Sequence, residues 1–371
     1  MRLLFDATVL EYPATGVAKV TLGLYAACRK QVPSLDIVGL HRRPFSAPLP
    51  SGIRASQWGS FLPPALWRRI HLPAATLRQK NPIIHFPWNG KVPLLPPSAT
   101  VLTTLHDVLP LIIPGHFADA AAERKYRNER QADISRTDLL LTDSDYSKRE
   151  IQNNFTVRQE PVVIPFGPTL TASEPAFPAG QEKYFLYVGG YDPRKGLPQL
   201  LKAFLDLYKE GKLHSKLVLT GSKLHVSETF QQLVREGVKL GALDEQGYVS
   251  DATLASLYAG ALALVYPSKY EGFGLPPLEA MTLGCPVITT RCTSLPEVCG
   301  DAAYYIDPDS PSSIGQSLLE VETNSTLRAR LRELGKQQAA GFSWERAAEI
   351  FLSALERTMQ TRASHIVSRR S

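Results

Sequence analysis

Short, continuous runs of apolar residues recur along the chain and alternate with longer segments of helical periodicity. Runs rich in Val, Ile and Leu, without alternating polar positions, are typical of strands buried on both faces of a parallel sheet. The first half contains six such runs, at residues 2–9, 36–40, 82–86, 100–107, 138–144 and 161–167. The second half contains five more, at residues 184–190, 216–221, 261–267, 286–290 and 302–307.

The segments between these runs have the spacing of amphipathic helices. Residues 16–31 repeat apolar positions every three or four residues, which predicts a helix with one buried face. Residues 144–155 begin with Ser144, a residue type that caps helix N-termini. Further helices are predicted at 196–210, 227–239, 251–259, 277–284, 310–322, 325–339 and 342–360.

A segment without periodicity separates the two series. Residues 167–183 are rich in Pro, Ser, Thr and Gly, so we interpret 169–182 as a linker. Two strand–helix series joined by a linker predict an α/β protein with two doubly wound, Rossmann-like domains, at 1–168 and 183–344. Ligands of such sheets bind at the carboxyl ends of the strands, so we expect a ligand in a cleft where the two domains face each other.

Composition narrows the class of protein. The 371 residues are 44% hydrophobic and 20% charged, as in soluble globular proteins, and no apolar run reaches the 18 residues of a membrane span. Lys plus Arg exceed Asp plus Glu by 41 to 35, which suits an anionic ligand or membrane surface but is too small an excess for a nucleic-acid binder. The apolar run at the N-terminus is too short for a signal peptide. The four cysteines contain no CxxC pair, so we expect them to be reduced thiols in a cytoplasmic protein.

Residues 271–279 join a predicted strand to a predicted helix and carry two carboxylates. Glu271 follows the strand, Glu279 lies in the first turns of the helix, and two glycines and Phe273, expected at the surface, lie between them. Glycines let backbone amides approach a phosphate, and a helix N-terminus favours its charge, while carboxylates accept hydrogen bonds from sugar hydroxyls. A nucleotide-sugar offers both groups. The alternative is that Glu279 only offsets the helix dipole and that Glu271 is a solvated loop residue.

Three further segments place polar or glycine residues at strand ends. Arg194 and Lys195 follow the strand at 184–190 and could hold a diphosphate, although a solvated turn would contain the same residues. His106 follows the strand at 100–107; a lone histidine is more often simply hydrogen-bonded, but this position would face the cleft. Gly16 begins the first helix after a loop, although no G-x-G-x-x-G is present.

Four motifs, in this order, carry a family resemblance: YVGGYDPRKG, GYVSDATLASLYAGA, YEGFGLPPLEAMTLGCPVI and SLPEVCGDAAYYIDP. They resemble the retaining glycosyltransferases of family 4, and the resemblance covers nearly the whole chain. It implies the GT-B fold, in which two Rossmann-like domains face each other across a cleft. It also implies that the last helix crosses back, so that residues 345–371 join the first domain.

The resemblance assigns a role to each matching residue. Glu279 matches the glutamate that binds the donor ribose, Glu271 the one near the transferred sugar, and His106 a histidine near the reacting face of that sugar. Lys195 matches the lysine that neutralises the diphosphate. Many relatives carry an arginine where this chain has Gly190, so we assign the second cation to Arg194. The other matching donor-binding residues are Gly16, Tyr248, Val249, Ser250, Phe273, Gly274 and Leu275.

The resemblance to bacterial mannosyltransferases of surface polysaccharide synthesis suggests GDP-mannose as the donor. The acceptor would be a saccharide or a lipid-linked glycan of O-antigen or exopolysaccharide synthesis. The implied reaction retains the anomeric configuration and needs no metal or other cofactor. We expect a same-face mechanism in which the leaving phosphate accepts the acceptor's proton. A UDP-sugar donor, a nucleotide-sugar epimerase and a non-catalytic nucleotide-sugar-binding subunit are the alternatives.

Residues 61–80 combine aromatic and basic side chains. Phe61 and Trp67 alternate with arginines in a segment that could bind an anionic membrane surface. The alternative is an amphipathic helix packed on the first domain. The chain is therefore expected in the cytoplasm, with peripheral contact to the inner face of the plasma membrane left open and with no nucleic-acid partner.

Overall fold

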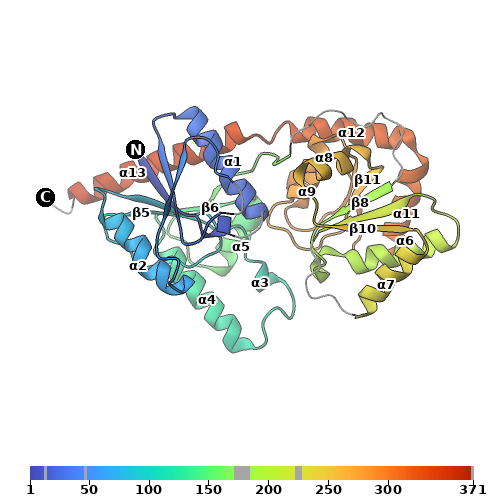
Figure 1. Ribbon diagram of the computed structural model, residues 1–371, viewed down its shortest axis with the longest axis horizontal. Helices are drawn as coiled ribbons and strands as arrows, with labels where there is room; N and C mark the ends of the chain where they lie inside the picture. The colour runs from blue at the N-terminus through green and yellow to red at the C-terminus, as the bar shows by residue number, and fades with distance from the viewer. Residues whose placement is uncertain (12–14, 46–47, 171–183, 222–227, 369–371) are drawn as a thin grey trace. The chain divides into compact units, whose positions relative to one another are not determined.

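The computed structural model describes residues 1–371 except 12–14, 46–47, 171–183, 222–227 and 369–371. The predicted linker at 169–182 lies outside the described residues from position 171 onwards. The chain divides into two compact units (Figure 1), and each is described by itself. Unit 1 comprises Met1–Gly167 and Ser343–Ser371, and unit 2 comprises Pro168–Phe342.

Unit 1 is built on a seven-stranded sheet in which every pairing is parallel. The strand order is β3-β2-β1-β4-β5-β6-β7, so the direction of winding reverses between β1 and β4, as in a doubly wound fold. The strands are β1 (Arg2–Asp6), β2 (Asp36–His41), β3 (Ile53–Gln57), β4 (Ile83–Phe86), β5 (Thr100–Thr104), β6 (Leu139–Thr142) and β7 (Val162–Val163).

The helices of unit 1 are α1 (Gly16–Gln31), α2 (Pro64–Leu77), α3 (Leu109–Ile112), α4 (Ala120–Ser135), α5 (Asp145–Asn154) and α13 (Trp344–Ser368), with a 3₁₀ turn η1 (Thr8–Glu11). The predicted cap is confirmed, because the Ser144 hydroxyl oxygen accepts a hydrogen bond from the Ser147 amide at 3.1 Å. No helix joins β4 to β5, so that connection runs as irregular chain.

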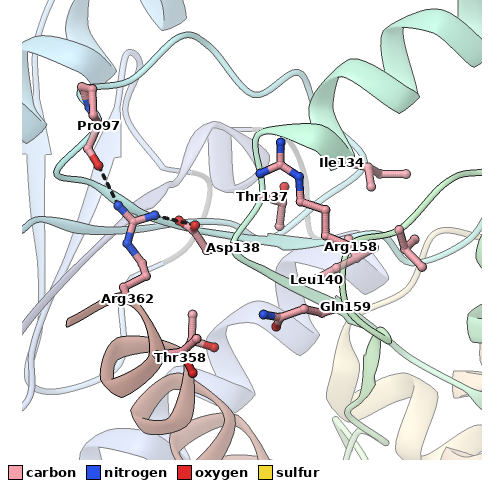
Figure 2. Close-up of a pocket in the computed structure, with 11 residues that line it drawn as sticks. Pro97, Ile134, Thr137, Asp138, Leu140, Arg158, Gln159, Thr358 and Arg362 are labelled. Carbon is pink, nitrogen blue, oxygen red and sulfur yellow. Dashed lines mark hydrogen bonds and ion pairs between the residues drawn. The ribbon is translucent and has the colours of Figure 1, made fainter. Parts of the chain in front are cut away.

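The last helix, α13, packs along α1 within unit 1 (Figure 1). Ala347, Phe351 and Leu355 on one face of α13 are fully buried. A Cβ atom on Gly23 of α1 would lie only 2.6 Å from the Trp344 ring, so the two helices meet closely at this point. Near the other end of α13, Arg362 forms an ion pair with Asp138 (Figure 2). The helix is therefore part of the core of unit 1.

Unit 2 repeats the architecture with a six-stranded parallel sheet in the order β10-β9-β8-β11-β12-β13. The strands are β8 (Tyr184–Val188), β9 (Lys216–Thr220), β10 (Leu243–Gly247), β11 (Ala263–Tyr266), β12 (Val287–Thr290) and β13 (Ala303–Ile306). The helices are α6 (Leu197–Lys209), α7 (Glu228–Lys239), α8 (Asp251–Gly260), α9 (Leu275–Thr282), α10 (Leu295–Cys299), α11 (Pro311–Thr323) and α12 (Ser325–Ala339), with a 3₁₀ turn η2 (Pro193–Lys195). The winding reverses between β8 and β11.

Both sheets confirm the predicted class, an α/β protein with two Rossmann-like domains. Among the described helices, none has the length and apolar content that crossing a bilayer requires.

Candidate functional site

The point where the winding reverses in unit 2 brings two predicted segments together. Because β8 and β11 are neighbours and parallel, the segments that follow them leave the same edge of the sheet side by side. After β8 comes η2 with Arg194 and Lys195, and after β11 comes the segment with Glu271. The sequence predicted both segments at strand ends, and the structure joins them.

Gly196 allows the two segments to interlock. It adopts a left-handed conformation with φ of +67°, and a Cβ atom at this position would lie 2.2 Å from the carbonyl oxygen of Pro267. Beside it, the Lys269 amide donates to the Arg194 carbonyl at 2.9 Å. Backbone contact at this point fixes where the Arg194 and Lys195 side chains begin.

Gly196→Ala is expected to destabilise unit 2 by roughly 3 kcal/mol, from left-handed strain plus the clash with Pro267. Gly211→Ala is the matched control, because Gly211 has the same φ of +67° and no atom lies within 4 Å of its Cβ position. We expect Gly211→Ala to cost only about 1 kcal/mol. Urea unfolding of both variants measures the difference, and equal losses would contradict the interlock.

Glu271 is the centre of a buried cluster of charges and hydroxyls. Its side chain accepts hydrogen bonds from Lys195 Nζ at 2.6 Å, Tyr266 OH at 2.8 Å and Ser268 Oγ at 2.5 Å. Arg194 Nη1 lies 3.4 Å from its second oxygen. Glu271 is only 8% exposed, so the alternative of a solvated loop residue is wrong for this glutamate.

The protonation states of this cluster follow from its geometry. Burial alone would raise the pKa of Glu271, but the charges of Lys195 and Arg194 and the hydrogen bonds hold that pKa below its ordinary value. Burial lowers the pKa of Lys195, against the opposing pull of the Glu271 charge. Asp192, whose side chain is 52% exposed, also lies 3.4 Å from Arg194, so the positive excess is confined to the buried part of the cluster, where Arg194 and Lys195 face Glu271. That buried excess suits an anionic ligand at this edge of the sheet.

Helix α9 begins where the glycine-rich segment ends. Gly274 precedes it with φ of +127°, a conformation that L side chains rarely adopt, and α9 begins at Leu275, two residues before the predicted start. The amides of this segment therefore form the N-terminus of the helix, where anions bind favourably. Phe273 is buried, 8% exposed, with its ring centroid 6.0 Å from that of Phe342, so the expected surface position is wrong. The buried ring of Phe273 therefore fixes this glycine-rich segment to the interior of unit 2.

Glu279 lies on the inner side of α9 and is 4% exposed. Its carboxylate accepts hydrogen bonds from Tyr258 OH at 3.3 Å and from the Thr169 hydroxyl. These partners hold the carboxylate in place, and a carboxylate is the kind of acceptor that ribose hydroxyl groups bind.

The segment Tyr248–Ser250 follows β10, two strands away from β8 along the same edge. Tyr248 is 66% exposed, which is unusual for so large an aromatic side chain. The Ser250 hydroxyl caps α8 by accepting a hydrogen bond from the Thr253 amide at 3.2 Å, and Val249 is half-buried. The Ser250 carbonyl also accepts a hydrogen bond, from the Leu254 amide at 2.8 Å, so Ser250 caps α8 with both its side chain and its backbone.

In unit 1, His106 forms a buried pair that the sequence did not predict. Its Nδ1 lies 2.8 Å from Asp143, and its Nε2 lies 3.0 Å from the carbonyl oxygen of Pro87. The Pro87 carbonyl can only accept a hydrogen bond, and the Asp143 carboxylate accepts when it is ionised, so both ring nitrogens carry a proton in the ionised pair. Burial alone would lower the pKa of His106, but the Asp143 charge and the hydrogen bonds outweigh it and raise that pKa to about 9. His106 is thus a cation whose ring protons are used within unit 1.

This pair predicts a pH-dependent stability of unit 1. Because the folded pKa of about 9 exceeds the ordinary value of 6.5, the stabilisation is complete below pH 6.5 and is lost as the pH rises through 9. We expect a loss of about 3 kcal/mol over this interval. Thermal melts of the wild type and His106→Gln from pH 6 to 9.5 test it, with His116→Gln, at an exposed position, as control. A wild-type slope that His106→Gln leaves unchanged would contradict the assignment.

Gly16 is the first residue of α1, and the Thr15 hydroxyl caps that helix by accepting from the Ala18 amide. The site residues thus fall into two groups, with Gly16 and His106 in unit 1 and the others in unit 2. The predicted cleft between the two domains stays a prediction.

A separate cavity of about 410 Å³ lies in unit 1 beside α13 (Figure 2). Pro97 and Asp138 line it. Pro97 lies shortly before β5 and Asp138 directly before β6, so the cavity is at the amino ends of these two strands. Ligands of doubly wound sheets bind at the opposite edge. Arg362 donates to the Pro97 carbonyl and pairs with Asp138, so its guanidinium ties α13 to the sheet.

Comparison with known proteins identifies the family. The profile of the group 1 glycosyl transferases matches residues 171–338. The O-antigen chain mannosyltransferase B of Escherichia coli is 31% identical over 373 residues, covering 93% of this chain and 97% of that protein. The chain belongs to the group 1 glycosyl transferases. It is an enzyme of the glycosyltransferase class, as the motifs predicted.

Two other matches differ in extent. The serotype-specific mannosyltransferase WbdA of Escherichia coli is 25% identical over 272 residues, which cover 69% of this glycosyltransferase but only 33% of WbdA. A sucrose-phosphate synthase structure from Thermosynechococcus elongatus superposes with a TM-score of 0.77 at 18% identity, covering 97% of this chain and 99% of that one. At that identity the match bears on the fold alone, which is GT-B.

Proposed function

We propose that this glycosyltransferase transfers mannose from GDP-mannose, with retention of configuration, to a glycan or lipid-linked oligosaccharide of O-antigen or exopolysaccharide synthesis. The observation that carries the proposal is the cluster of Arg194, Lys195 and Glu271 where the winding of the unit 2 sheet reverses. The names of the relatives, O-antigen chain mannosyltransferase B above all, support mannose as the sugar.

In this proposal the second domain, 183–344, binds the donor. Lys195 and Arg194 would hold the diphosphate together with the amides of Gly274 and Leu275 at the start of α9. Glu279 would accept hydrogen bonds from the ribose hydroxyls. The backbone of Tyr248–Ser250 would meet the base. The first domain, 1–168 with 345–371, would bind the acceptor and contribute Gly16 and His106.

The proposed chemistry follows from where charge develops. As the bond to the sugar breaks, negative charge grows on the leaving nucleoside diphosphate, and the two cations and the α9 N-terminus would stabilise it. No metal is required in this scheme, because protein charges supply what a metal would. The leaving phosphate accepts the acceptor's proton on the same face of the sugar.

The role of Glu271 in this scheme is to orient groups rather than to attack the sugar. Its carboxylate already accepts three hydrogen bonds and faces two cations, and this lowers its nucleophilicity. It would position Lys195 and receive a sugar hydroxyl. Sugar transfer would take place in the cytoplasm, at the inner face of the plasma membrane if the acceptor is lipid-linked.

A thermal-shift panel of GDP- and UDP-sugars tests the donor assignment. A ligand that binds the folded state raises its stability by about 2.7 kcal/mol at a hundred times its Kd, so GDP-mannose should raise the melting temperature most. Glu279→Ala should reduce this shift, since it removes the proposed ribose contact. A larger shift with a UDP-sugar would contradict the proposed base, and isomerisation of a bound sugar without acceptor would indicate an epimerase.

A further inference from the structure

Helix α2 has apolar residues on the side that faces solvent. Trp67 and Leu72 on its inner side are fully buried in the core of unit 1. At 100° per residue, Leu66, Ile70 and Leu77 lie within about 40° of one another on the opposite side, and Pro73 lies next to them on the same side. Their exposed fractions are 43%, 44% and 71%. A surface helix normally presents polar residues there, so this face calls for a contact outside the unit.

Neighbouring residues extend this apolar surface. Phe61, 80% exposed, packs against Trp58 with ring centroids 6.3 Å apart. Trp58 is tied to α2, because its carbonyl accepts a hydrogen bond from Trp67 Nε1 at 2.6 Å and its ring stacks on His71. Six of the ten large apolar side chains exposed among the described residues lie between residues 58 and 94. Exposed apolar residues that are scattered singly over a surface are normal, but so many within one segment form a patch that indicates an interaction site.

The same part of the chain is strongly basic. Between residues 37 and 106 the sequence has eight Lys and Arg and no Asp or Glu, which is more than the net charge of +6 of the whole chain. Arg69, Arg78 and Lys80 lie along and just beyond α2 and are exposed. Within the described part of the chain, these three side chains have no acidic partner in an ion pair. Cations beside an exposed apolar stripe are typical of helices that lie in the headgroup region of a membrane.

A cavity borders this surface. It measures about 1120 Å³ and is lined by residues of α2, of the irregular connection from β4 to β5, and of α4. Arg69 and Leu94 line it, and Leu94 is 76% exposed. A phosphate of a lipid headgroup could therefore reach Arg69 beside the apolar stripe.

We propose that the outer face of α2, formed by Leu66, Ile70, Leu77, Arg69, Arg78 and Lys80 and extended by Phe61, binds the surface of an anionic lipid bilayer. This inference deepens the proposed function, in which the acceptor is lipid-linked, by naming the residues that contact the membrane. Charge complementarity selects this partner. A second copy of the chain would bring like charges together across a twofold axis.

Vesicle flotation of the full chain tests the proposal. We expect the protein to float with phosphatidylcholine vesicles containing 30% phosphatidylglycerol at ~0.05 M salt, and not with pure phosphatidylcholine. The variant Arg69→Ala/Arg78→Ala/Lys80→Ala should bind about a hundredfold more weakly, since each cation contributes about a factor of five. The variant Leu66→Gln/Ile70→Gln/Leu77→Gln should lose at least about tenfold.

Matched controls exist in unit 2. Lys202→Ala/Arg235→Ala/Lys239→Ala removes three exposed cations, and Val238→Gln/Leu240→Gln removes exposed apolar groups, and both should bind vesicles like the wild type. Donor-induced thermal shifts of the α2 variants should be unchanged. The membrane inference would be overturned if the wild type did not float, or if it floated equally well with neutral vesicles. It would also be overturned if the unit 2 control variants lost as much binding as the α2 variants. If the wild type floats with anionic vesicles but no nucleotide-sugar shifts its melting temperature, the proposed function is refuted while the membrane inference stands.

Discussion

Lys195→Met is expected to reduce both the stability of unit 2 and the rate of sugar transfer. Removing the ammonium leaves the buried carboxylate of Glu271 with Arg194, 3.4 Å away, as its remaining cation. Breaking a buried ion pair in this way costs about 3 kcal/mol. Removing a group that stabilises charge on the leaving diphosphate should lower kcat/KM by about 10²–10³-fold.

A second substitution separates the two effects. Lys195→Met/Glu271→Gln removes the unpaired charge, so the free energy of unfolding should return to within about 1 kcal/mol of the wild type while transfer stays lost. Urea unfolding and a steady-state transfer assay on both variants measure this. Full activity in either variant would contradict the assignment of the diphosphate site. Low stability in the double variant would show that Lys195 acts through packing rather than charge.

Ending the chain after Phe342 is expected to unfold unit 1. The truncation removes α13, whose Phe351 and Leu355 are fully buried against the rest of that unit. Deleting one large buried side chain costs about 2–5 kcal/mol, so losing the whole face approaches the total stability of a domain. Circular dichroism melts should show loss of the cooperative transition of unit 1. Unit 2 contains none of α13 and should keep its donor-induced thermal shift, which makes it the internal control.

Phe351→Ala provides a graded version of the same test. It leaves α13 in place but removes a ring that lies 5.6 Å from His85, centroid to centroid. The expected loss is about 3–5 kcal/mol in unit 1. If the truncated chain melts like the full chain, α13 is not part of the core of unit 1 and the helix does not return to the first domain as the resemblance implied.

The fold was largely predictable because its strands are buried on both faces. Continuous apolar runs revealed 11 of the strands, whereas β3 and β10 were missed. In β3 only Ile53 is buried, and in β10 only Leu243, because edge strands face solvent and need no apolar run. Helix α4 was missed for a similar reason, since two of its three buried positions are Arg130 and Asp133 and only Ile134 is apolar.

The candidate site was predictable in its residues but not in its interactions. Strand ends and glycines marked Glu271 and Lys195, yet a sequence does not show that their side chains touch at 2.6 Å. Tyr266 and Ser268 were missed because their roles depend on which side of the strand end they face. Asp143 was missed because the predicted strand at 138–144 included it, whereas β6 ends at Thr142 and leaves the carboxylate to meet His106.

Transfer of labelled mannose tests the central claim most directly. The enzyme is incubated with GDP-[¹³C]mannose and lipid-linked oligosaccharide acceptors, and the anomeric configuration of the product is read by NMR. We predict that labelled mannose joins the acceptor in the α configuration of the donor, with release of one GDP per sugar, and that Lys195→Met slows this transfer by about 10²–10³-fold. Transfer from a UDP-sugar instead, an inverted β-linked product, or full transfer by Lys195→Met would contradict the account.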